Sequence, residues 1–159
     1  MAMSPVAEKY HCIIDASNVA RLGSEKAKIG RLQNAFNKLA SINLKFTCIA
    51  DANLRHLIDN REEYEKMIDE SLVIQAPAGS RADTFILRLA RELSHECVTS
   101  YLMTNDNQLI QMATGDNRIR GIHFIFVPWE EKESMIFDPG LETLQEELKS
   151  PKTGCSTHE

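Results

Sequence analysis

The chain has 159 residues, of which 43% are hydrophobic, and this suits one globular domain with a single core. It has no apolar run of about 18 residues and no secretory signal, and its four cysteines are scattered, so we expect a reduced, cytoplasmic protein without disulfides, zinc or a membrane partner. The net charge of −5 does not exclude a nucleic-acid partner, because residues 129–159 hold eight acids and three bases, whereas residues 1–128 hold 15 of each.

Strand-like and helix-like segments alternate along the first half of the chain. The apolar run HCIID at residues 11–15 predicts a strand, and apolar residues at helical spacing predict a helix over residues 25–40. A second strand is expected at residues 46–51. A third is expected at residues 71–75, after a helix that Asn60 caps.

The second half continues the alternation. The clearest helical periodicity lies at residues 82–93, and it is followed by a strand-like run at residues 98–106 that ends in an acid. A short helix is expected at residues 108–113, a fifth strand at residues 122–128 and a terminal helix at residues 138–148.

Strands that alternate with helices predict an α/β fold, in which helices cover both faces of a mostly parallel sheet of about five strands. Residues 1–149 are expected to form a single domain that includes the terminal helix, and residues 150–159 a flexible tail.

Three aspartates stand at points that this architecture brings together. Asp15 ends the first strand in IIDASNVAR, Asp83 opens the best helix in SRADTFILRLARE, and Asp106 ends the fourth strand in LMTNDNQLI. Clustered carboxylates repel one another unless a cation neutralises them, and Mg²⁺ and Mn²⁺ prefer oxygen ligands. The constellation therefore predicts a divalent metal site suited to phosphodiester hydrolysis by an activated water.

Each aspartate also has an ordinary structural interpretation. Asp15 could form an Asx turn, and Asp83 stands in a capping-box relation to Ser80. Asp106 could cap the short helix that follows it. Only the convergence of all three favours a metal site over three separate local roles.

Polar residues near these acids are candidates for holding substrate. Asn18 follows Asp15 by three residues and is expected to hydrogen-bond Asp15 or a substrate phosphate, while basic residues that flank the site are expected to contact phosphates. The candidate substrate contacts are Ser17, Asn18, Arg21, Arg81 and Asn105. The bases interpreted as solvated are Lys26, Lys28 and Arg31.

Taken together, the three acid-bearing segments resemble the NYN branch of PIN-domain nucleases, most nearly the Regnase type, over about residues 10–128. The resemblance rests on a strand followed by D-x-S-N, an aspartate that opens a helix after a glycine-containing loop, and a strand followed by [ST]-N-D-N. It implies a three-layer α/β/α PIN-like sandwich and Mg²⁺- or Mn²⁺-dependent cleavage of single-stranded RNA. By motif position the implied metal ligands are Asp15, Asp83 and Asp106, and the implied active-site asparagine is Asn18.

Two positions depart from the family pattern. Ala82 stands where an acid pair often begins, and Ile110 stands where a further acid commonly follows Asp106. Asp51 could supply a replacement ligand, although a turn residue is the commoner role at a strand end, and Asp116 is a weaker substitute. These departures leave open a catalytically reduced PIN-like domain that binds RNA or a protein partner, and they leave a homodimer open.

Other classes of protein fit less well. The chain has neither G-x-G-x-x-G nor G-x-x-x-x-G-K-[ST], which argues against dinucleotide and P-loop chemistry. A metal-dependent adhesion module needs D-x-S-x-S, and Val19 stands where the second serine should be. A small toxin-type ribonuclease that is held by an antitoxin has no sequence signature here that would test it.

Overall fold

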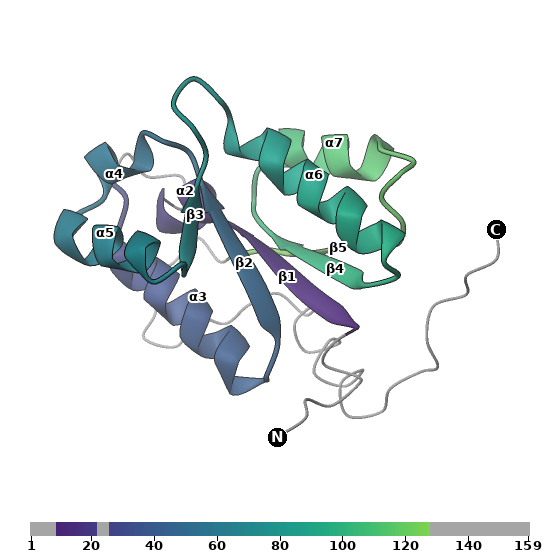
Figure 1. Cartoon of the computed structure of the whole chain (residues 1–159), viewed down its shortest axis with the longest axis horizontal. Coiled ribbons are helices and arrows are strands. Elements are labelled where there is room, and N and C mark those ends of the chain that lie inside the picture. The colour runs from purple at the N-terminus through teal and green to yellow at the C-terminus, as the bar shows by residue number, and fades with distance from the viewer. Residues whose placement is uncertain (1–8, 22–25, 128–159) are drawn as a thin grey trace.

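The computed structural model describes residues 9–21 and 26–127. Within them, five parallel strands form one sheet in the order β3-β2-β1-β4-β5 (Figure 1). The strands are β1 (Tyr10–Asp15), β2 (Lys45–Ala50), β3 (Val73–Gln75), β4 (Thr99–Met103) and β5 (His123–Ile125). The predicted parallel α/β fold is confirmed.

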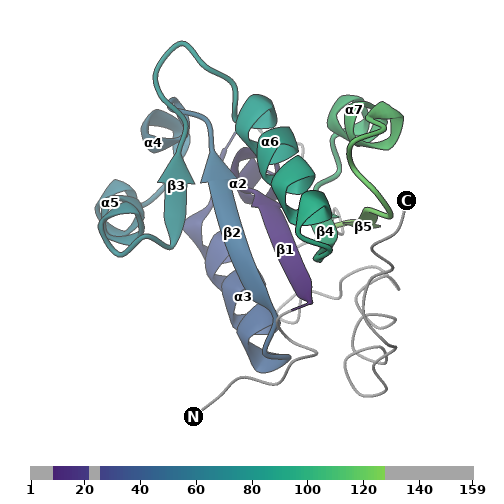
Figure 2. The same ribbon diagram turned by 45° about the vertical axis from the view of Figure 1, so that its right-hand side comes forward.

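Helices cover both faces of the sheet and give three layers (Figure 2). The helices that share one hydrophobic core with the sheet are α2 (Ala16–Arg21), α3 (Ile29–Ser41), α4 (Leu54–Leu57) and α5 (Arg61–Asp69). The helices that share the core on the opposite face are α6 (Ala82–His95) and α7 (Asn107–Gly115).

The central strands alternate between these two cores. On β1, Cys12 and Ile14 pack against the α3 side, whereas Ile13 between them packs against the α6 side. Successive side chains of a strand point to opposite faces, and both faces are buried here. This explains why the strands read as continuous apolar runs in the sequence.

Two short helices were not predicted from the sequence. Helix α2 follows β1 directly, and its ASNVAR segment contains residues that favour turns. Helix α4 has only four residues. Val19 in α2 and Leu54 in α4 are fully buried, so tertiary packing rather than helix propensity stabilises both helices.

The start of α3 also differs from the prediction. Ala27 pairs with Ile58 in an isolated parallel bridge, so the helix begins at Ile29 rather than near residue 25. The carboxylate of Asp59 accepts a hydrogen bond from the backbone N–H of Ile29 at 2.8 Å. A distant side chain therefore caps this helix, and a local sequence pattern cannot reveal such a cap. By contrast, the predicted cap of α5 is confirmed, because Asn60 accepts from the N–H of Glu63 at 3.1 Å.

Arg31 is not the solvated base that the sequence suggested. It is buried, and its Nη1 donates to the carbonyl oxygens of Ala20 at 2.8 Å and Arg21 at 2.9 Å. Arg31 therefore satisfies the carboxyl end of α2 and holds that helix against α3.

Three further expectations concern membrane spans, the cysteines and the C-terminal segment. No helix in the described part of the chain is long and apolar enough to cross a membrane. Cys12 and Cys48 are free and buried, but Cys97 is disulfide-bonded, so the prediction of a chain without disulfides is wrong at that residue. The helix predicted at residues 138–148 and the tail at residues 150–159 lie outside the described residues, and the domain limits stay predictions.

Candidate active site

The candidate site lies at the carboxyl end of the sheet, where the strand order changes direction. From β1 the chain places β2 and β3 on one side and β4 and β5 on the other, so the switch point lies between β1 and β4. Asp15 ends β1, and Thr104 and Asp106 come shortly after β4. Two of the three predicted acids therefore flank the position where α/β folds commonly bind ligands.

Asp15 is the most buried of these acids, with 4% of its surface exposed. The Thr104 hydroxyl donates to its Oδ2 at 2.8 Å, and the backbone N–H of Asn18 hydrogen-bonds the same carboxylate. The pKa of Asp15 is raised to about 7, chiefly by burial and also by the nearby charges of Asp83 and Asp106, while the hydrogen bonds from Thr104 and Asn18 act to lower it. Asp15 thus carries a charge that its surroundings disfavour.

The predicted capping box at the start of α6 is wrong. The N-cap residue is Arg81, not Ser80, and its side chain makes no capping hydrogen bond. Instead, the backbone N–H of Ala82 donates to Oδ1 of Asp51 at 2.7 Å. Because Asp51 performs the capping, the carboxylate of Asp83 is left for another role.

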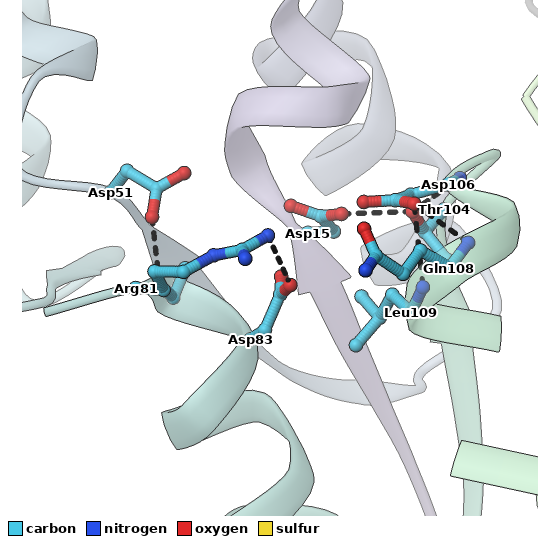
Figure 3. A network of polar contacts seen from close by, with 9 residues as sticks. Asp15, Asp51, Arg81, Asp83, Thr104, Asp106, Gln108 and Leu109 are labelled. Atoms are coloured by element: carbon cyan, nitrogen blue, oxygen red, sulfur yellow. Dashed lines mark hydrogen bonds and ion pairs between the residues drawn. The ribbon is translucent and has the colours of Figure 1, made fainter. Parts of the chain in front are cut away.

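Asp83 faces the other acids across the site (Figure 3). Partial burial raises its pKa, and the charges of Asp106 and Asp51 act in the same direction. The Arg81 guanidinium opposes them, with its Nη2 lying 3.0 Å from Oδ2 of Asp83. The Arg81 side chain is 68% exposed, and an ion pair so open to water contributes about 0–1 kcal/mol.

Asp106 has the capping role that the sequence offered as an alternative. Its Oδ1 accepts from the backbone N–H groups of Gln108 at 2.9 Å and Leu109 at 3.3 Å at the start of α7. Its own N–H donates to Oγ1 of Thr104 at 3.0 Å. Its Oδ2 makes no hydrogen bond within the described residues, so one carboxylate oxygen is available while the other caps the helix.

Two asparagines connect α2 and the segment that follows β5 to the site. Oδ1 of Asn18 accepts from the backbone N–H of Asn105 at 2.7 Å, which identifies Nδ2 as the end of the Asn18 amide that has no partner in the described chain. Both amide atoms of Asn105 bind the backbone of Val127, at 2.6 and 2.7 Å. This favours a positioning role for Asn105 over the substrate contact expected from the sequence.

The remaining predicted residues divide by location. Ser17 lies at the site, where its Oγ accepts from the backbone N–H of Asp51 at 3.3 Å. Arg21 ends α2, and its carbonyl oxygen accepts from Arg31. Asp116 is no substitute ligand, because it pairs with Arg91 at 2.7 Å and Arg118 at 3.1 Å at the far end of α7.

Asp15, Asp83 and Asp106 are near enough to perturb one another electrostatically, but they do not form a finished metal site. Among the residues that the structure describes, no group of three or more His, Cys, Asp or Glu side chains is arranged to hold a metal ion. Oδ1 of Asp106 binds the N–H groups at the start of α7, and Oδ2 of Asp83 pairs with Arg81 (Figure 3). The metal-ligand set therefore stays a prediction.

Thr104 is the residue that sequence reasoning missed. It is fully buried and joins the site by donating to Asp15 and accepting from the N–H of Asp106. The spacing of residues in the motif LMTND could have identified Thr104. Thr104 lies two residues after Leu102, which packs in the core on the α6 side of the sheet. Because side chains of a strand alternate between its two faces, Thr104 is directed to the α6 side as well.

The family model of the Zc3h12a-like ribonuclease NYN domain matches residues 8–150. The chain belongs to this family. A search of curated proteins finds no match. Membership in the NYN ribonuclease family confirms the resemblance drawn from the three acid motifs and supports a nuclease function for this fold.

Proposed function

We propose that this NYN domain is a metal-dependent ribonuclease that hydrolyses phosphodiester bonds of single-stranded RNA. The observation that carries the proposal is the state of Asp15. Its buried carboxylate is hydrogen-bonded by a hydroxyl and a backbone N–H, while Asp83 and Asp106 add negative charge nearby. Buried charges are normally paired, so this arrangement calls for a cation from outside the chain.

The donor set fits Mg²⁺ or Mn²⁺, which bind carboxylate oxygens. Oδ2 of Asp106 makes no hydrogen bond in the part of the chain that the structure describes, and Arg81 is exposed and weakly held, so two of the acids have room to turn toward Asp15. When bound, such an ion supplies a water of lowered pKa and neutralises charge on the phosphodiester. The expected products carry 5′-phosphate and 3′-hydroxyl ends.

The chain's own residues would orient the RNA and the acids. Thr104 holds the Asp15 carboxylate in place, and Nδ2 of Asn18, which has no partner among the described residues, is a donor suited to a phosphate oxygen. The Ser17 hydroxyl can donate in the same region. Arg21 and Arg81 are proposed to contact the phosphates on either side of the scissile bond.

A second candidate function is a catalytically reduced domain that only binds RNA or a protein partner. It is favoured by one specific observation: the side chain of Asp106 already has a structural role as the N-cap of α7. If capping were its only role, the site would lack one of the three proposed ligands.

Asp106→Asn separates the two candidates. Asparagine caps helices about as well as aspartate, so the substitution retains the cap and removes the charge. The matched control is Asp59→Asn, because Asp59 caps α3 through an equivalent hydrogen bond and is not among the acids that raise the pKa of Asp15. Cleavage of labelled single-stranded RNA and DNA is measured while Mg²⁺ or Mn²⁺ is titrated.

The nuclease proposal expects metal-dependent RNA cleavage that Asp106→Asn removes and Asp59→Asn retains, with both variants folded. RNA binding without cleavage under either metal would instead establish the binding module. Equal cleavage by both variants would exclude Asp106 as a ligand.

A further inference from the structure

A cleft of about 730 Å³ opens beside the acids, at the carboxyl ends of β2 and β3. One wall comes from the segment that follows β2 and includes α4, and the other comes from the connection between β3 and α6. Figure 1 shows this connection projecting beyond the ends of the strands. The volume lies within the range of pockets that hold one small ligand.

The cleft and the acidic site share residues. Asp51 lines the cleft and caps α6 through Ala82, while Arg81 lines it and pairs with Asp83. In Figure 3, Asp51 and Arg81 lie on the side of Asp83 away from Asp106. An RNA chain with its scissile phosphate at the acids would therefore have a neighbouring nucleotide at this cleft.

Apart from Arg81, the lining of the cleft favours a base over a phosphate. Arg55 already pairs with Glu65 at 2.7 Å, whereas the exposed Arg81, which pairs only weakly with Asp83 at 3.0 Å, is the cation proposed to contact the phosphate next to the scissile bond. Asp51 adds a negative charge. The rest of the lining includes three alanines and Pro77, and such a neutral, partly apolar surface suits a nucleobase.

Two side chains in the cleft have unused recognition chemistry. The imidazole of His56 is exposed, makes no hydrogen bond in the described chain, and offers a ring face on which an unpaired base can stack. The buried Tyr64 hydroxyl donates to Oε1 of Gln75 at 3.2 Å, which leaves the Nε2 donor of Gln75 without a partner among the described residues.

Tyr64 holds this arrangement at neutral pH. A phenol is protonated at neutral pH, and burial raises the pKa of Tyr64 further, so the hydroxyl continues to donate to Gln75. Across the cleft, a turn closed by the hydrogen bond from Ser80 N to Pro77 O at 3.0 Å shapes the other wall, and Gly79 at φ +86° supplies the left-handed residue that this turn needs.

We propose that this cleft is a nucleobase subsite, in which the base of an RNA nucleotide next to the scissile phosphate stacks on His56 and accepts a hydrogen bond from Nε2 of Gln75. This subsite rests on the proposed function for the position of the phosphate. It makes Gln75 a specificity-determining residue, because a donor at this point selects bases that present an acceptor.

The test is an abasic scan of a short single-stranded RNA, in which one nucleotide at a time lacks its base. The full chain is assayed twice, for cleavage with Mn²⁺ and for binding in a chelator. The variants are His56→Ala and Gln75→Glu, which retains the acceptor for Tyr64 and removes the donor. The control is His95→Ala, because His95 is also an exposed histidine and lines a different cleft at the other end of α6.

In the wild type and in His95→Ala, we expect removal of the base at one fixed distance from the cut to weaken binding by about 5- to 150-fold, the range that stacking of one base gives. In His56→Ala, removal of the base at that position should weaken binding no more than removal of a base elsewhere. Gln75→Glu changes which base is preferred there.

The outcomes separate this inference from the proposed function. Metal-dependent cleavage with no base-sensitive position would overturn the subsite and leave the nuclease standing. Binding that depends on His56 and Gln75 without cleavage under any metal would retain the subsite and remove the nuclease. A base-sensitive position that His56→Ala leaves unchanged would also overturn the subsite.

Discussion

Asp15 is buried and Asp116 is partly buried, and the molecule handles their charges in opposite ways. The Asp116 side chain is 8% exposed and pairs with Arg91 and Arg118, whose hydrogen bonds hold its pKa well below the usual range. Asp15 is 4% exposed and is hydrogen-bonded by the neutral Thr104 hydroxyl, and burial together with nearby acids raises its pKa to about 7.

A structural acid differs from a functional one in whether the chain supplies its counter-charge. A charge removed from solvent destabilises a fold unless it is paired, and Arg91 and Arg118 supply the opposite charge for Asp116. Asp15 is not given a cationic partner by its described neighbours, and Asp83 and Asp106 add negative charge to the same region. A carboxylate kept in this state is suited to an external cation.

Asp15→Asn should reduce RNA cleavage by at least about 100-fold, because loss of even an outer partner of a metal ligand costs about 10–100-fold. The metal-free variant should be no less stable than the wild type, since the amide removes a disfavoured buried charge. Asp116→Asn should do the reverse, with cleavage retained and the unfolding temperature lowered. Initial cleavage rates and thermal unfolding of both variants check this. If each variant lost both cleavage and stability, the two aspartates would not differ in role.

The two aspartates should also give opposite pH dependences of stability in the metal-free protein. The pKa of Asp15 is raised by folding from 3.8 to about 7. The stabilisation that the protonated carboxyl gives to the fold is therefore fully present below pH 4 and is lost as the pH rises toward 7. The pKa of Asp116 is lowered by folding, so its contribution is present above pH 4 and is lost at lower pH.

Denaturant unfolding between pH 3 and 8 in a chelator measures these slopes. The Asp15 contribution should be on the order of a few kcal/mol. Asp15→Asn should flatten the curve between pH 4 and 7, and Asp116→Asn should flatten it only below pH 4. An unchanged slope in Asp15→Asn would show that this carboxylate has an ordinary pKa.

Thr104→Val should reduce cleavage by about 10–100-fold, because it removes the hydroxyl that orients Asp15 and leaves the N–H of Asp106 without its acceptor. Thr104→Ser is the matched control, since it keeps the hydroxyl and should retain most of the activity. Steady-state kinetics with RNA distinguish the two, and equal rates in both would remove Thr104 from the site.

Arg81→Gln should have the smallest effect. The substitution removes an exposed ion pair worth about 0–1 kcal/mol, so Mn²⁺ affinity should rise by at most about fivefold. The KM for RNA should rise as well, because a phosphate contact is lost. Lys66→Gln on α5 is the control for general charge, and a fall in Mn²⁺ affinity in Arg81→Gln would contradict the account.

The sequence predicted the architecture because the signals for strands and long helices are local and periodic. The run HCIID and the apolar stripe of α6 show their burial directly in the spacing of residues. The acids at the ends of β1 and β4 then follow from the parallel topology, which places the carboxyl ends of the strands together.

The remainder depends on contacts between residues that are distant in sequence. Asp51 caps α6 from 31 residues away, and Asp59 caps α3 from 30 residues away. From the sequence alone Arg31 is interpreted as an exposed helix residue, whereas in the structure it donates a hydrogen bond to the carboxyl end of α2. The partners of these bonds are too far apart in the sequence for a local pattern to include both, so these roles are visible only in the structure.

A calorimetric titration of Mn²⁺ into the metal-free protein measures whether the Asp15 carboxylate holds a divalent metal. We expect saturable binding to the wild type and to Asp116→Asn, with a rise in unfolding temperature, and no binding to Asp15→Asn. Equal Mn²⁺ binding by the wild type and Asp15→Asn, or none by the folded wild type, would show that the buried carboxylate does not hold a metal.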